Sequence, residues 1–138
     1  MTDGETVSVL ELALHGVTLG YLAGYRDGQT ILTFTPEFAA DEARPTFSLI
    51  THPAFPTAQE IMAKPWVRQQ KLHPVLSNLL PEGALREYLA QALKTHTENE
   101  FELFTYLGQD LPGALIATGI EPDDVPNYVL NDSARANA

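Results

Sequence analysis

The chain contains no cysteine, which excludes disulfide bonds, thiolate metal sites and cysteine nucleophiles. Basic residues are also scarce: eight Lys and Arg stand against eighteen Asp and Glu, for a formal net charge of −10. A negative surface disfavours non-specific binding to nucleic acid and to anionic membrane. No apolar run approaches the roughly 20 residues that span a bilayer, and the acidic opening MTDGE lacks the basic start of a signal peptide. These absences predict a soluble, cytoplasmic protein that contacts neither membrane nor nucleic acid directly.

The 138 residues, 44% of them apolar, are enough for one domain with its own core. The first third has the β-rich, alternating character of strands. We expect strands over residues 7–14, 17–25 and 30–34, separated by the turn signals His15-Gly16 and Asp27-Gly28. Because such short turns cannot connect parallel strands, these segments predict an antiparallel meander.

Prolines interrupt the next forty residues, so long regular elements are not expected there. They are Pro36, Pro45, Pro53, Pro56, Pro65 and Pro74. Within this region residues 46–50 are predicted to form one short edge strand. Near the other end of the chain, residues 114–118 are predicted to form a last strand.

Two helices are expected between the proline-rich region and that last strand. The first has apolar residues at the spacing of a buried stripe, namely Leu85, Tyr88, Leu89, Ala92 and Leu93. The second begins near Asn99, with Glu102 in an arrangement close to a capping box. The fold class is therefore predicted as α+β, with a small antiparallel sheet, a proline-rich loop region and two packed helices. The domain is expected over residues 1–120, followed by a flexible acidic tail over residues 121–138.

No motif indicates catalysis or a bound cofactor. The histidines His15, His52, His73 and His96 lack the spacing of metal ligands on a helix, and the glycines match neither a P-loop nor a dinucleotide fingerprint. Glu100 and Glu102 lie two residues apart on a predicted helix, so they are expected on different faces and in solvent. We therefore predict a protein that is not an enzyme, with no catalytic residue, cofactor or metal.

The stretch over residues 61–81 has a positive net charge, opposite to that of the chain, because it holds Lys64, Arg68 and Lys71 and no acidic residue. It also holds Trp66, the only tryptophan. Two interpretations of this ring are open: it covers the edge of the sheet, or it is exposed as an anchor for a partner, as Trp often is at interfaces. Composition favours the first. These four residues are nonetheless the hypothesis for a partner-binding site.

Two motifs resemble those of a known family. Residues 77–86 read SNLLPEGALR and precede an apolar helix, and residues 107–114 read LGQDLPGA after an aromatic-rich helix. Both are similar to signatures in the N-terminal domain of HipA-type serine/threonine kinases, the toxin kinases of bacterial toxin–antitoxin operons. The resemblance covers residues 6–120 and supports a small sheet at the start of the chain.

The simplest role of the motif residues is structural. They are Asn78, Pro81, Glu82, Gly83, Arg86, Gly108, Asp110 and Gly113. Asn78 and Pro81 are expected to organise the start of a helix, Glu82 to favour its positive end and Gly83 to permit close packing. Turn and capping chemistry explains these residues without a catalytic site.

A full HipA-type protein carries a kinase core after this domain, whereas this chain stops at Ala138. The resemblance therefore implies the small HipS-like protein of split systems, which accompanies a shortened HipT-like kinase and a HipB-like DNA-binding protein. The hypothesis is a non-enzymatic antitoxin that binds and inhibits the separate kinase, with Trp66 and its basic neighbours over the kinase cleft. Two alternatives stay open: the N-terminal scaffold of a HipA-type kinase toxin, and a structural adaptor to the HipB-like repressor.

Overall fold

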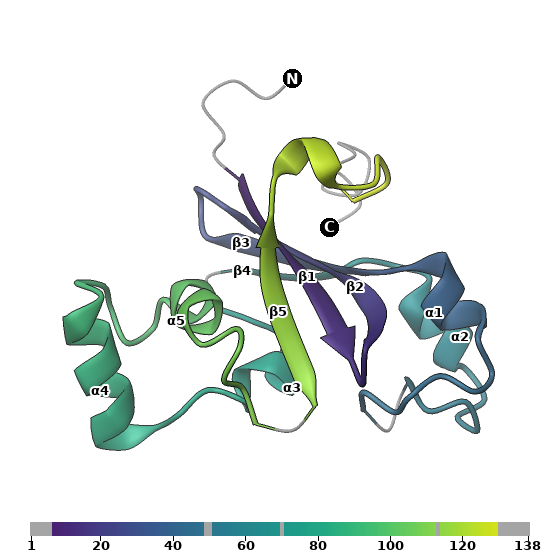
Figure 1. The fold of residues 1–138 in the computed structure, drawn as a ribbon, viewed down its shortest axis with the longest axis horizontal. Coiled ribbons are helices and arrows are strands. Elements are labelled where there is room, and N and C mark those ends of the chain that lie inside the picture. Colours follow the sequence, from purple (N-terminus) through teal and green to yellow (C-terminus); the bar gives the residue numbers. More distant parts are fainter. Residues whose placement is uncertain (1–6, 49–50, 70, 113, 130–138) are drawn as a thin grey trace.

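A five-stranded antiparallel sheet is the centre of the fold in the computed structural model, which describes residues 7–48, 51–69, 71–112 and 114–129. The strands are β1 (Val7–Leu14), β2 (Val17–Tyr25), β3 (Gln29–Phe34), β4 (Trp66–Gln69) and β5 (Leu115–Ile120). They lie in the order β4-β3-β2-β1-β5 (Figure 1). The predicted meander and last strand are confirmed.

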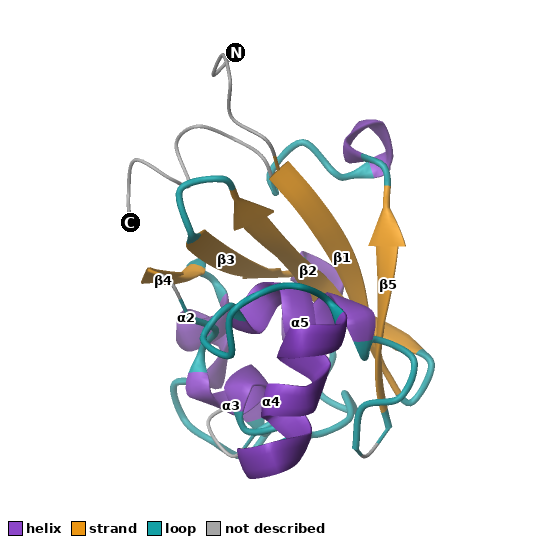
Figure 2. Cartoon of the chain, turned by 90° about the vertical axis from the view of Figure 1, so that its left-hand side faces the viewer, coloured by secondary structure: helices purple, strands orange, loops and turns teal. Residues whose placement is uncertain are grey.

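The helices are short. They are α1 (Pro36–Ala40), α2 (Ala58–Met62), α3 (Pro74–Ser77), α4 (Gly83–Ala92) and α5 (Glu100–Tyr106), followed by the 3-10 helix η2 (Pro122–Asp124). Helices α3, α4 and α5 gather on one side of the sheet, with α5 nearer to the strands than α4 (Figure 2). The α+β fold class is thus confirmed. None of the helices in the described ranges has both the length and the apolar character needed to cross a bilayer.

One row of side chains runs across the sheet and forms the centre of the core. The register pairs Leu10 with Leu22, Leu22 with Leu32, and Leu32 with Trp66. The three leucines are at most 2% exposed, and Phe104 of α5 belongs to the same buried cluster. Because side chains alternate between the two faces of a strand, this register directs the row toward the helices.

The proline-rich region is organised by one buried cation. Arg44 is 4% exposed, and its guanidinium donates hydrogen bonds to the carbonyls of Thr51 (2.8 Å), Asp41 (3.0 Å) and Ala39 (3.2 Å). Buried polar groups need such partners, so these bonds hold a loop that has few bonds of its own.

The edge strand predicted within this region is not observed at residues 46–48, and residues 49–50 lie outside the described ranges. The edge position beside β3 is taken by β4 instead. Pairing with β3 depends on register with a segment more than thirty residues away, which local composition does not encode.

The prediction of a buried apolar stripe on α4 is wrong. Leu85 is 56% exposed and Tyr88 is 67% exposed, whereas Ala90 is the buried residue of the helix. Leu89 and Leu93 are half-buried and pack against the core. The reason is position: α4 lies at the outer end of the helix layer (Figure 1), so only one side of it reaches the core.

The segment after β5 also differs from the expected loose tail. Val125 is 8% exposed and Val129 is 1% exposed, and both pack with Val9 and Ala23 on the face of the sheet opposite the helices. Residues 121–129 therefore belong to the packed domain. Residues 130–138, the rest of the predicted tail, lie outside the described part of the chain.

Gly108 lets the chain after α5 approach β5. A Cβ atom at Gly108 would collide with the carbonyl oxygen of Ala117. We expect Gly108→Ala to lower the free energy of unfolding by about 1–3 kcal/mol through overpacking, measured by urea denaturation. Gly119→Ala is the matched control, because a Cβ there meets no heavy atom within 4 Å. Equal stability of the two variants would contradict this account.

Candidate partner-binding site

A buried ion pair fixes α4 to α5. Glu100, the first residue of α5, is 5% exposed, and its Oε2 lies 2.9 Å from Nη2 of Arg86 on α4. Nε of Arg86 also donates to the Thr97 carbonyl over 2.8 Å. The guanidinium therefore joins the first half of α4 to the loop before α5 and to the first turn of α5. A charge-assisted, hydrogen-bonded pair of this kind orients its two elements closely.

The Glu100 carboxylate has two further donors. Its Oε1 accepts a hydrogen bond from the Leu72 N–H at 2.9 Å, and its Oε2 accepts one from the Ser77 hydroxyl at 3.0 Å. Burial by itself raises the pKa of Glu100, but the hydrogen bonds from Leu72, Arg86 and Ser77 outweigh burial and hold the pKa below its ordinary value. One carboxylate thus ties together α3, α4, α5 and the segment after β4.

The expectation that Glu100 is solvated is wrong, while Glu102 is exposed as expected. The inference from spacing was sound, because the two carboxylates do lie on different faces. Glu100 is buried because it meets partners that lie 14–28 residues away in sequence, namely Leu72, Ser77 and Arg86. A carboxylate in the first turn of a helix also suits the helix dipole, and this is the one local signal that could have marked Glu100.

The exposed side of α4 is the clearest apolar surface that the network holds in place. Leu85 and Tyr88 are three residues apart, so they are neighbours on the helix surface. Both are exposed, while Arg86 and Ala90 face the body of the protein. Exposed aromatic and aliphatic side chains on a rigid element are typical of interface anchors. We call Leu85 and Tyr88 the α4 face.

The basic segment lies on and beside β4. Lys64, Arg68 and Lys71 are exposed. Lys71 also lines a hollow together with Gly83 and Glu87 of α4. The end of the basic segment and the start of α4 are thus neighbours in space, although more than ten residues separate them in sequence.

Trp66 is packed, in agreement with the interpretation that its ring covers the sheet. Its Nε1–H donates to the Ile61 carbonyl over 3.0 Å. Its ring meets Phe34 edge-on, with centroids 4.7 Å apart, and lies 4.4 Å from the ring of His73. Burial, and then the nearby charge of Arg68, lower the pKa of His73. The structure therefore brings the four predicted residues to one region, with Trp66 as the inward-facing member.

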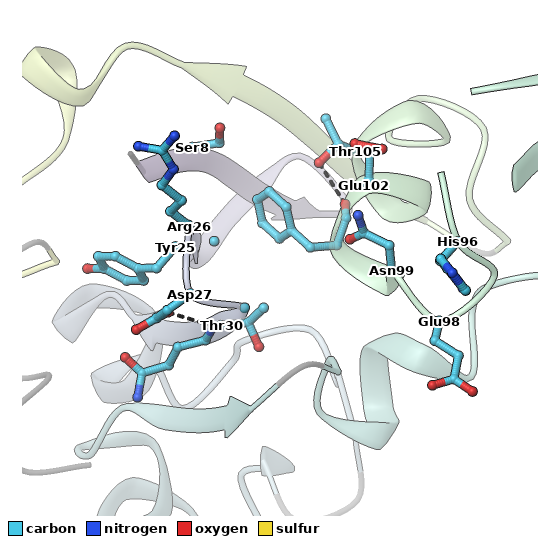
Figure 3. Close-up of a pocket in the computed structure, with 14 residues that line it drawn as sticks. Ser8, Tyr25, Arg26, Asp27, Thr30, His96, Glu98, Asn99, Glu102 and Thr105 are labelled. Carbon is cyan, nitrogen blue, oxygen red and sulfur yellow. Dashed lines mark hydrogen bonds between the residues drawn. The ribbon is translucent and has the colours of Figure 1, made fainter. Parts of the chain in front are cut away.

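A second hollow, with a volume of about 930 Å³, lies between the β2–β3 turn and the start of α5. Figure 3 shows Arg26 and Asp27 on one side of it and His96, Glu98 and Asn99 on the other. Its lining carries both signs of charge. No group of three His, Cys, Asp or Glu residues in the described ranges is arranged to hold a metal ion.

His52 and His73, which flank the proline-rich region, each act in a local turn. The Nδ1 of His52 accepts from the Ala54 N–H at 3.0 Å, and that of His73 accepts from the Val75 N–H at 3.2 Å.

At the start of α5 the predicted capping box is not formed, because the Asn99 side chain makes no cap hydrogen bond and donates instead to Thr95.

The motif residues around α4 have distinct local positions. Asn78 is the C-cap of α3 rather than part of the start of α4, and Pro81 is half-buried. Glu82 is the N-cap of α4 without a side-chain cap bond. Gly83 has a φ of +65°, and a Cβ there would meet nothing within 4 Å. Its requirement for glycine is therefore the left-handed backbone, and the expected close packing is wrong.

The motif residues after α5 lie near β5. Gly108 contacts Ala117, as described above. Asp110 is exposed, and its N–H donates to the Leu107 carbonyl over 2.7 Å. Gly113 lies outside the described residues. A turn after α5 and a close approach to β5 account for the two described positions.

Comparison with known proteins gives two findings. The family model described as the HipA N-terminal domain matches residues 10–118. A curated protein of Sinorhizobium fredii (strain NBRC 101917 / NGR234), named "Putative kinase Y4dM", is 39% identical over 120 residues. The alignment covers 87% of this chain and 29% of that relative. The chain therefore spans less than a third of the length of the curated protein that it matches.

Stability should fall in acid because of Glu100. Its pKa is below the ordinary value in the folded state, so ionised Glu100 contributes stability at pH values above the pKa of the unfolded chain, about 4.3. That contribution is lost as the pH falls through the lower, folded-state pKa. We expect Glu100→Gln to reduce this acid dependence in urea titrations, whereas Glu102→Gln, on the exposed side of α5, retains it. An unchanged profile for Glu100→Gln would contradict the network.

The packing of Trp66 predicts a structural cost for truncation. We expect Trp66→Ala to lower the free energy of unfolding by about 3 kcal/mol, because the ring leaves a cavity beside Phe34. Trp66→Phe should lose less, since it keeps an aromatic ring in the row across the sheet. Thermal and urea unfolding measure both variants. Wild-type stability of Trp66→Ala would instead indicate a ring that is free to anchor a partner.

Proposed function

Because the chain belongs to the HipA N-terminal domain family, we propose that it is a non-enzymatic regulatory subunit that binds and inhibits a separately encoded HipA-type serine/threonine kinase, as an antitoxin. The observation that carries the proposal is the α4 face, which presents Leu85 and Tyr88 to solvent on a helix anchored by a buried ion pair. A rigid anchor loses little conformational entropy on binding, so its burial translates efficiently into affinity.

The basic segment supplies the electrostatic part of the proposed contact. Lys64, Arg68 and Lys71 are exposed on a chain whose net charge is −10. An acidic surface on the kinase would be steered to this segment and repelled by the rest of the chain, which fixes the orientation of docking. In this arrangement Trp66 supports the cations from within, and inhibition follows from occupation of the kinase surface beside them.

A second candidate function is favoured by the extent of the match. The aligned region is 29% of the putative kinase, so the same domain can serve as the scaffold of a longer HipA-type kinase. In that case the α4 face would pack against the catalytic part of the same protein. The two functions share the contact surface and differ in whether the kinase is a separate chain.

Co-expression distinguishes them. Under the leading proposal, the chain rescues growth from a separately encoded HipA-type kinase and lowers its phosphorylation activity. Under the scaffold proposal, the chain raises the activity or stability of the catalytic part instead. Binding to a HipB-like repressor with no change in phosphorylation would indicate an adaptor and contradict both.

The α4 face can be tested by replacing its two anchors. We expect Leu85→Ser with Tyr88→Ser to weaken kinase binding about 1,000-fold, because two hot-spot side chains at about 2 kcal/mol each contribute about 4 kcal/mol. Isothermal titration measures the affinity, and urea denaturation should show little loss of stability, since both side chains are exposed.

The matched control is Val17→Ser with Ile116→Ser. These residues are also exposed, at 39% and 43%, but they lie on β2 and β5. The control pair should bind the kinase as the unchanged chain does. Wild-type affinity of the α4 pair, or an equal loss in the control pair, would show that docking does not use the α4 face.

A further inference from the structure

The two edges of the sheet differ in how far they are covered. β4 and β5 lie at opposite edges (Figure 2). Along β5, the Ala117 N–H donates to the Gly108 carbonyl over 2.9 Å, and the Gln109 side chain donates to the Ala117 carbonyl and the Thr118 hydroxyl. The segment after α5 thus occupies this edge. An edge covered in this way cannot accept another strand.

Beside β4 no further strand lies in the part of the chain that the structure describes, and the outward groups of this edge can be identified. The Thr35 N–H donates to the Leu19 carbonyl over 2.9 Å, so these residues form a hydrogen-bonded pair between the ends of β2 and β3. Hydrogen-bonded and non-hydrogen-bonded pairs alternate along antiparallel strands. Ile31, four residues before Thr35, therefore bonds to its partner Ala23 on β2. Val67, opposite Ile31 on β4, consequently turns its N–H and C=O away from the sheet.

Outside the ladders of the sheet, no backbone hydrogen bond of the Val67 N–H or C=O is found within the described ranges. Within the β3–β4 ladder, these two groups face away from β3. The strand itself is held firmly. Trp66 anchors its start through the Ile61 carbonyl, the Gln69 side chain donates to the Asp27 carbonyl, and the Thr30 hydroxyl donates to the Lys71 carbonyl. An ordered edge with free donors and acceptors is a template for one more strand.

The charge around this edge selects the occupant. Lys64, Arg68 and Lys71 are exposed on β4 or beside it, and residues 61–81 hold no acidic residue. In space Lys71 shares a hollow with Glu87 of α4, so Lys64 and Arg68 dominate the positive charge of this edge. A second copy of the chain pairing through the same edge would place these cations against one another, which like-charge repulsion opposes. An extended segment rich in Asp and Glu would place its carboxylates beside them instead.

We infer that the β4 edge binds an extended acidic segment of a partner protein, which joins the sheet as a sixth strand next to Val67. Backbone hydrogen bonds to the outward groups of β4 would supply affinity, and ion pairs to Lys64, Arg68 and Lys71 would supply specificity. The inference deepens the proposed function and rests on it for the identity of the partner, in which the acidic segment would belong to the HipA-type kinase.

The probe is a peptide of about eight residues, a common strand length, that alternates Glu and Val. A peptide with Lys in place of Glu is its control. With the full ¹⁵N-labelled chain, we expect the acidic peptide to shift the amide signals of Val67 and Gln69 and to slow their hydrogen exchange. The basic peptide should not do so, although the net charge of −10 favours it. Equal effects of both peptides, or effects centred on β5, would overturn the inference.

Two variants separate the backbone contribution from the charge. Val67→Pro removes an outward N–H that β3 does not use, a position where an edge strand tolerates Pro, whereas Val67→Ala keeps it. Arg68→Glu reverses one charge at the β4 edge. Lys94→Glu is its control, because it reverses one charge at a position after the end of α4 and not at the edge. We expect Val67→Pro and Arg68→Glu each to weaken binding of the acidic peptide by about tenfold, with both controls unchanged. Unchanged binding by Arg68→Glu overturns the inference even where Val67→Pro fails to fold.

The kinase complex then separates the two proposals. In one outcome the Arg68→Glu variant no longer binds the acidic peptide but still rescues growth from the kinase. This would overturn the inference that the kinase adds a sixth strand at β4, and it would leave the proposed function standing. Peptide binding at β4 together with no binding of any HipA-type kinase would leave the acidic-strand site standing and overturn the proposed function.

Discussion

The helical half of this domain depends on the buried carboxylate of Glu100. It accepts hydrogen bonds from the Leu72 N–H, the Ser77 hydroxyl and the Arg86 guanidinium at 2.9–3.0 Å. Each donor comes from a different segment, so one side chain sets the positions of three segments relative to α5. Breaking such a pair leaves an uncompensated buried charge, which is far more costly than losing a surface ion pair. This cost explains how α4 keeps its place with so little apolar burial of its own.

The arrangement has a consequence for binding. The Arg86 ion pair adds to the core contacts of Leu89 and Ala90 in holding α4. The opposite side of the helix, with Leu85 and Tyr88, is exposed to solvent. The same logic applies at β4. Trp66 packs into the row that runs through Leu32 and so fixes an edge strand whose outer groups stay free. On both α4 and β4, a side chain that packs inward holds the element in place, and residues close to it in sequence are exposed. Arg86 does this beside Leu85, and Trp66 does it near Arg68.

Local pattern predicted the first three strands and β5, because the first three have β-rich composition and are separated by turn signals such as Asp27-Gly28. It placed an edge strand at residues 46–50 and missed β4, whose pairing with β3 depends on a distant register. It failed for α4, where the spacing of Leu85, Tyr88 and Leu89 indicates an apolar side but not what covers it. It failed for Glu100 for a related reason: partners 14–28 residues away turn a surface carboxylate into a buried one. Val125 and Val129 lie in a polar, acidic stretch whose composition does not predict packing. Their contact with Val9 and Ala23 shows that this segment belongs to the domain.

The sequence by itself determined the class of the fold, the order of its main elements, the family to which the chain belongs, and the sign reversal around Trp66. These features are encoded by composition, turn chemistry and contiguous motifs, which are local along the chain. The tertiary structure alone decided which side of α4 is exposed, which strand lies at the open edge, and which carboxylate is buried. Those outcomes depend on register and on contacts between distant segments, and the free energy of such contacts exists only once the chain has folded.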